Sequence, residues 1–192
     1  MRALVLTVMA NVPFAATLGE HASLWSIRLS LLLLVCCLAL QSRGLNSTDW
    51  RLAGLWFLGA LLAACHSLGA LWTFHHGSQW EAFQSTAQQT EEMIGVRLGA
   101  GLYINYLFVC VWLFDSIWRI GSARTYGKLP SIYHWLTLGF LLFIAFNGAV
   151  VFKSGLMRWL GILCTALLLF LWIRRRNLVG GVDRLGRKPK TR

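Results

Sequence analysis

The sequence predicts an all-α protein, a polytopic bundle of transmembrane helices, and three observations lead to this class. Of 192 residues, 57% are hydrophobic and only 13% are charged, which is a membrane composition. Apolar segments of about 20 residues follow one another with short polar gaps, and a helix of that length crosses a hydrocarbon core of roughly 30 Å. Most of the ten tryptophans lie near the ends of these segments, where the membrane–water interface favours aromatic rings.

The apolar segments predict six spans in one domain, residues 1–173, followed by a basic tail, residues 174–192. The first segment is ambiguous because it has a basic start, a short apolar run and small residues near its end, as a cleaved signal peptide has. Five spans remain if that segment is removed. The six segments cover residues 3–18, 24–41, 52–76, 95–118, 132–152 and 156–173.

The charges between the segments predict the orientation, since cytoplasmic loops favour Lys and Arg. Residues 42–51 and 119–131 carry Lys and Arg, and the tail holds eight of them and one Asp. Residues 77–94 carry three Glu and no Lys or Arg. We therefore expect an inner membrane of bacterial type, with the N- and C-termini in the cytoplasm.

The net charge of +11 raises the question of nucleic acid as a partner. Most of the excess lies in the tail, directly after the last apolar segment, where basic residues are topology signals that attract anionic lipid headgroups. We therefore expect membrane lipids as partners, together with other membrane subunits or further copies of the chain, and no nucleic acid.

A sharp corner is predicted at residues 75–81. Gly77 is the residue type found just beyond helix ends, and Ser78-x-x-Glu81 matches the capping box that opens a new helix. The helix that follows would place Trp80 and Phe83 on one face and lie in the interface on the outer side of the membrane.

A candidate intramembrane polar site comprises His66, Asn105 and Asn147. His66 falls in a helical stripe with Gly69 and Thr73, and such a face of small and polar residues is typical of close helix contact. The stripe therefore favours packing, without excluding a site.

The alternative is a haem or metal site, with copper as the favoured metal and zinc as another option. His66 and His76 would be about 15 Å apart along a helix, too far to bind one ion together, so ligands must come from several segments. The candidates are His66, His21, His75, His76, Glu91 and Glu92.

Asp115 precedes Arg119 by four residues, the favourable order for a helical ion pair. Ionisable groups within spans are costly and are functional candidates by default. Two interpretations stay open, a local ion pair and part of a proton or ion path.

Two glycines of the fourth segment, Gly95 and Gly99, have the small-xxx-small spacing of close helix contacts. The five cysteines fall in apolar runs without a C-x-x-C pair, as small hydrophobic residues do.

No catalytic residue is identified, and the sequence favours a non-enzymatic accessory or scaffolding subunit. A redox protein with haem or a metal is the first alternative, and a small transporter or channel is the second.

Overall fold

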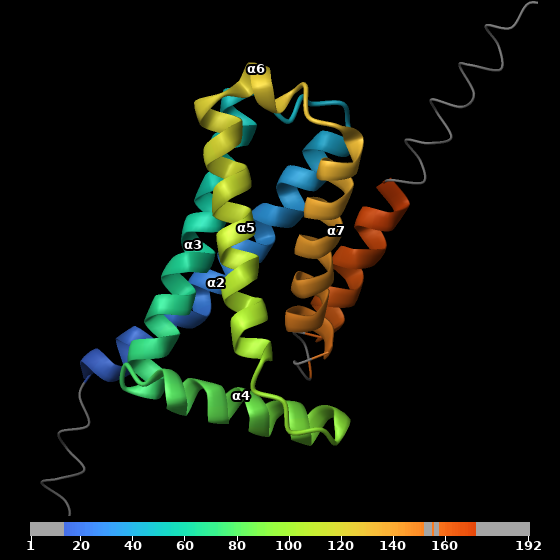
Figure 1. Ribbon diagram of the computed structural model, residues 1–192. Helices are drawn as coiled ribbons and strands as arrows, with labels where there is room; N and C mark the ends of the chain where they lie inside the picture. Colours follow the sequence, from blue (N-terminus) through green and yellow to red (C-terminus); the bar gives the residue numbers. More distant parts are fainter. Residues whose placement is uncertain (1–13, 152–154, 156–157, 172–192) are drawn as a thin grey trace, which may run out of the picture.

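A computed structural model describes residues 14–151, 155 and 158–171, and within this part the chain is helical without a strand. Figure 1 shows long helices side by side, with the helix Gln79–Ile94 lying across the end of the bundle. The elements are α2 (Phe14–Ser42), α3 (Trp50–His75), α4 (Gln79–Ile94), α5 (Gly101–Gly121), α6 (Ala123–Tyr126), α7 (Ser131–Phe146), a π-helical turn (Asn147–Val151) and a shorter apolar helix (Arg158–Leu171).

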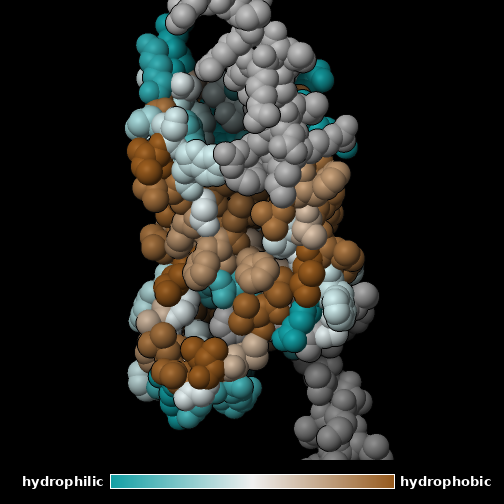
Figure 2. Space-filling model, turned by 90° about the vertical axis from the view of Figure 1, so that its right-hand side faces the viewer, coloured by the Kyte–Doolittle hydropathy of each residue, from teal (hydrophilic) through white to brown (hydrophobic). Residues whose placement is uncertain are grey.

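Four described segments are long and apolar enough to cross a membrane: Leu18–Ser42, Trp50–His75, Gly101–Gly121 and Ser131–Val151. The face shown in Figure 2 has hydrophobic side chains around its middle and hydrophilic ones toward both ends. A hydrophobic middle with polar ends is the pattern expected when lipid is the solvent. The helices therefore indicate a membrane protein.

Helix α2 extends beyond the second predicted segment. It is continuous from Phe14, so the outer loop predicted before residue 24 is helical, and His21 lies in this helix rather than in a loop. The extension packs against α3, because a Cβ at Gly19 would lie 3.4 Å from Thr73 and one at Gly69 would lie 3.6 Å from Ser23. Residues 3–13 of the first predicted span are outside the described part.

The fourth predicted span begins later than expected, and the small-xxx-small interpretation of Gly95 and Gly99 is wrong. Gly95 has a φ of 73° and ends α4, whereas α5 begins only at Gly101. The left-handed conformation suits glycine because it has no Cβ. Gly99 instead makes room for Phe83 of α4, whose ring would lie 2.5 Å from an added Cβ.

The core lies where α2, α3 and α5 meet, and two tryptophan rings fill its centre. Trp56 and Trp112 are almost fully buried, and their rings meet edge to face with centroids 5.5 Å apart. Helix α3 approaches closely at Gly59, whose carbonyl oxygen accepts a 2.7 Å hydrogen bond from the Ser30 hydroxyl of α2. The absence of a side chain at Gly59 leaves room for the Trp112 ring.

The corner between α3 and α4 lies at the predicted position. One of the two hydrogen bonds of the capping box is present, since the Ser78 N–H donates to the His75 carbonyl instead of to Glu81. His76 adopts a left-handed conformation (φ 51°) beyond the end of α3, and the Ser78 hydroxyl accepts a 3.2 Å hydrogen bond from the Glu81 backbone N–H. Helix α4 then lies across the end of the bundle opposite α6 (Figure 1). It buries Ala82, Ala87 and Thr90 and leaves Trp80 exposed.

Substitution of Gly59 tests this packing. A Cβ at Gly59 would lie 2.8 Å from the buried Trp112 ring, so Gly59→Ala should lower the free energy of unfolding by about 1–3 kcal/mol, as overpacking does. Unfolding of the detergent-solubilised protein by sodium dodecyl sulfate measures the effect. Gly54→Ala in the same helix is the control, because nothing lies within 4 Å of its added Cβ. Equal stability of the two variants would contradict this packing.

Candidate functional site: a polar pocket beside Asp115

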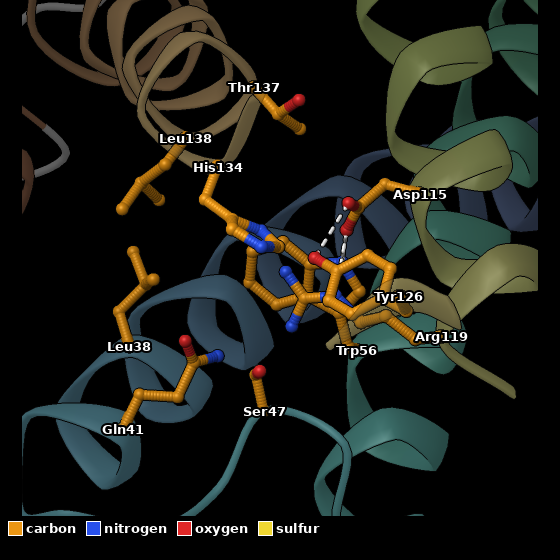
Figure 3. A pocket seen from close by; sticks show the side chains of 10 residues that line it. All are labelled: Leu38, Gln41, Ser47, Trp56, Asp115, Arg119, Tyr126, His134, Thr137 and Leu138. Atoms are coloured by element: carbon orange, nitrogen blue, oxygen red, sulfur yellow. Dashed lines mark hydrogen bonds and ion pairs between the residues drawn. The ribbon is translucent and has the colours of Figure 1, made fainter. Parts of the chain in front are cut away.

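A buried carboxylate organises one end of the bundle. Asp115 on α5 has no exposed surface. Its Oδ2 accepts hydrogen bonds from Trp56 Nε1 and Arg119 Nε, each at 2.8 Å, and its Oδ1 accepts from the hydroxyls of Tyr126 at 2.9 Å and Tyr133 at 3.2 Å. Figure 3 shows the carboxylate among its labelled partners. We call these five residues the Asp115 network.

The network joins four helices. Asp115 and Arg119 are one helical turn apart on α5, whereas Trp56 comes from α3. After α5 the chain reverses through the short helix α6, which supplies Tyr126. Helix α7 supplies Tyr133 from its first turn. The carboxylate therefore fixes α3, α5, α6 and α7 relative to one another.

Four hydrogen-bond donors surround the Asp115 carboxylate. Each oxygen accepts two hydrogen bonds, and bonds to a charged acceptor are stronger than neutral ones. The Arg119 guanidinium lies 4.2 Å from the centre of the Trp56 ring and 5.1 Å from that of Tyr126, so aromatic faces also stabilise the cation. Burial, the largest cause, raises the pKa of the Tyr126 hydroxyl well above its usual value, and the neighbouring carboxylate adds to the rise while Arg119 opposes it. Tyr126 therefore remains a hydrogen-bond donor at physiological pH.

A cavity of about 130 Å³ lies beside the network. One water molecule needs roughly 10–15 Å³ of such space, so the cavity has room for a larger polar group. The α2–α3 turn, α6 and the first turns of α7 surround it (Figure 3). Its walls are formed by Leu38, Gln41, Ser47, Trp56, Asp115, Arg119, Tyr126, His134, Thr137 and Leu138.

One donor in the cavity wall has no acceptor. Arg119 is only 7% exposed, and its Nη1 has no hydrogen-bond partner among the described residues. A buried donor without an acceptor costs free energy, more so when it is charged. The pocket therefore offers a fixed, charged hydrogen-bond donor.

Sequence reasoning identified Asp115 and Arg119 but missed the rest of this site. The ion pair is present, with Arg119 Nε 2.8 Å from Asp115 Oδ2. A proton path through this pair stays a prediction. Trp56, Tyr126 and Tyr133 were not singled out, although a buried carboxylate requires donors. The indole N–H and phenol O–H groups are the aromatic donors that could have been sought.

The structure places His66, Asn105 and Asn147 in separate surroundings. His66 Nδ1 lies 2.8 Å from the Ser23 carbonyl oxygen on α2. Asn105 is exposed on α5, and Asn147 Nδ2 donates a 2.7 Å hydrogen bond to the Phe143 carbonyl of the preceding turn. A common site formed by these three residues stays a prediction.

The candidate metal or haem ligands lie toward the α4 end. His76 Nδ1 is 3.2 Å from Glu81, Glu91 is 3.9 Å from Arg97, and Glu92 accepts from Gln88. His21 is exposed, and His75 is partly buried in the last turn of α3. In the described segments, no three His, Cys, Asp or Glu side chains are grouped as metal ligands; cofactor binding stays a prediction.

Comparison of the chain with family models, with curated proteins and with solved structures gives no match. A fold class alone does not define a function. The inference of function therefore depends on the residues and their geometry, above all on the Asp115 network and the pocket beside it.

Removal of the charge at Asp115 should destabilise the bundle strongly. Asp115→Asn leaves the Arg119 cation buried without its counter-ion, and breaking a buried pair in this way costs about 3–5 kcal/mol. Thermal unfolding in detergent, followed by circular dichroism, measures the loss. Asp49→Asn at the same end of the bundle is the control: Asp49 caps α3, and Asn caps helices equally well. A melting temperature of Asp115→Asn equal to that of the control would refute the structural role of the network.

Proposed function

We propose that the chain is a non-enzymatic accessory or scaffolding subunit of the inner membrane, which packs against partner subunits or further copies of itself. The observation that carries the proposal is the surface of α7. Only Leu141 of this helix is buried, whereas α3 buries six residues. Helix α7 therefore has an exposed face that is available for contacts outside the described part of the chain.

The exposed side chains of α7 surround a notch. Leu136 and Phe143 are 67% and 64% exposed, and Gly139 lies between them at spacings of three and four residues, so the three share one face. Nothing lies within 4 Å of where a Cβ of Gly139 would be. Small residues let membrane helices approach closely, and this notch fits a large side chain from a neighbouring helix.

The Asp115 network supports a structural role. Both carboxylate oxygens accept two hydrogen bonds each, so the acid joins helices α3, α5, α6 and α7. Tyr133 connects α7 to this network, and α7 therefore presents its outer face from a fixed position.

The proposed topology has the C-terminus in the cytoplasm and α4 on the outer side. Its support is the separation of charge between the two ends of the bundle. The end that carries α6 has the exposed cations Arg43, Arg51, Arg124 and Lys128, and Figure 1 shows α4 at the opposite end. Cytoplasmic segments favour Lys and Arg, which assigns the α6 end to the cytoplasm.

Thiol labelling in intact cells tests this topology. A membrane-impermeant maleimide should label Gln88→Cys on α4 but not Lys128→Cys after α6, unless the cells are broken first. The unmodified chain provides the baseline, since its five cysteines lie in apolar segments. If Lys128→Cys were labelled in intact cells and Gln88→Cys were not, the orientation would be the opposite of the one proposed. The mass of the mature chain separates six spans from five, because loss of residues 1–18 would show a cleaved signal.

Filling the notch on α7 tests the accessory role. The wild-type protein, extracted in mild detergent, should migrate as a complex with a partner subunit or a second copy, and Gly139→Leu should release the single chain. Light scattering and mass spectrometry measure the mass and composition of the species. Gly54→Leu is the control, because Gly54 is also exposed with open space around it. A wild-type protein that is strictly monomeric with nothing bound would refute the proposal.

A further inference from the structure

The pocket beside the Asp115 network has the properties of a ligand site. The Arg119 guanidinium uses Nε for Asp115 and lines the cavity, and its buried Nη1 has no hydrogen-bond partner among the described residues. Figure 3 shows the guanidinium between the Tyr126 ring and the side chains of Gln41 and Ser47. The rigid guanidinium cannot turn this donor toward the carboxylate without giving up the Nε bond.

A ligand in the cavity can supply the acceptor that this donor lacks among the described residues. Both oxygens of Asp115 already accept two hydrogen bonds each. Leaving a charged donor buried without an acceptor is costly, and the cavity has room for a group larger than one water molecule.

The charges around the pocket favour an anionic acceptor. Four exposed cations, Arg43, Arg51, Arg124 and Lys128, lie on the segments that surround it. Together with Arg119 they oppose two acids, Asp49 and Asp115, in residues 41–51 and 115–131. Asp115 would repel an anion, but four donors surround its carboxylate and Arg119 neutralises it. The local field is therefore positive.

We propose that this pocket binds a phosphate group, supplied by the headgroup of an anionic phospholipid or by free phosphate. Arginine is well suited to phosphate because its N–H groups match the spacing of the oxygens. Ser47 and Thr137 add hydroxyl groups to the wall, and hydroxyls also donate to phosphate.

The shape of the pocket favours the lipid as the source. Leu38 of α2 and Leu138 of α7 form an apolar wall facing the polar one (Figure 3). Both leucines belong to helices long enough to cross the bilayer. Acyl chains could therefore follow the surface of α2 and α7 while the phosphate reaches Arg119. Basic pockets between membrane helices on the cytoplasmic side recognise anionic headgroups in this way.

Two variants change the pocket by different means. Arg119→Lys keeps a cation for Asp115 but withdraws the Nη1 donor. Ser47→Phe fills the cavity from the α2–α3 turn and leaves all five residues of the Asp115 network in place. Arg97→Gln is the control, because it removes an exposed cation from the opposite end of the bundle without changing the lining. Circular dichroism establishes which variants are folded. If Arg119→Lys does not fold, the result for Ser47→Phe alone tests the proposal.

Native mass spectrometry provides the lipid arm of the test. The full chain is reconstituted in nanodiscs of phosphatidylcholine with a minor fraction of phosphatidylglycerol, then released and weighed. The wild-type protein and Arg97→Gln should retain one phosphatidylglycerol. Ser47→Phe and Arg119→Lys should bind phosphatidylglycerol with an affinity lower by about tenfold or more, as expected for loss of a hydrogen bond to a charged group.

Thermal unfolding provides the arm for free phosphate. The delipidated protein in detergent is compared in phosphate and in chloride at equal ionic strength. A higher melting temperature in phosphate for the wild type and Arg97→Gln but not for Ser47→Phe, without a retained lipid, identifies free phosphate as the ligand. The proposal is overturned if neither probe binds, or if Ser47→Phe binds as strongly as the wild type.

Discussion

The structure depends on one constraint, the burial of the Asp115 charge at the end of an apolar bundle. An isolated carboxylate in such surroundings costs many kcal/mol unless hydrogen bonds and a counter-ion replace its water. Trp56, Tyr126, Tyr133 and Arg119 meet this need, and they come from four helices. The relative positions of these helices therefore follow from the requirements of a single side chain, whereas apolar contacts alone would tolerate several arrangements.

The fold could be predicted from the sequence where local chemistry decides it. The span of α3 follows from its apolar length, and the corner at Gly77 and Ser78 follows from capping groups within a few residues. Tertiary contacts decided the segments where the prediction was wrong. Helix α2 continues through Gly19 because it packs on α3 there, and Gly95 ends α4 in a left-handed conformation. Spacing alone could not separate that glycine from one on a helix-packing face.

The candidate site also has a part that local sequence predicts and a part that only tertiary contacts determine. Asp115 and Arg119 are four residues apart on one helix, so their ion pair is visible in the sequence. Trp56 is 59 residues from Asp115, and no local pattern joins them. The histidines drew attention because imidazole binds metals, yet His66 meets a backbone oxygen of the neighbouring helix. Residue type identified the chemistry that was possible, and the packing of the helices determined which groups meet.

Arg119 connects the two proposals. Its Nε donates to the carboxylate that joins α5 to α3, α6 and α7, and the same side chain lines the pocket, so one rigid guanidinium takes part in both. A ligand that binds only the folded bundle stabilises it in proportion to the logarithm of its concentration over its dissociation constant. A lipid phosphate at Arg119 would therefore hold α7 more firmly through Tyr133 and the pocket wall. Because the outer face of α7 carries the Gly139 notch, the lipid composition of the cytoplasmic leaflet would then affect how strongly the chain associates with its partner.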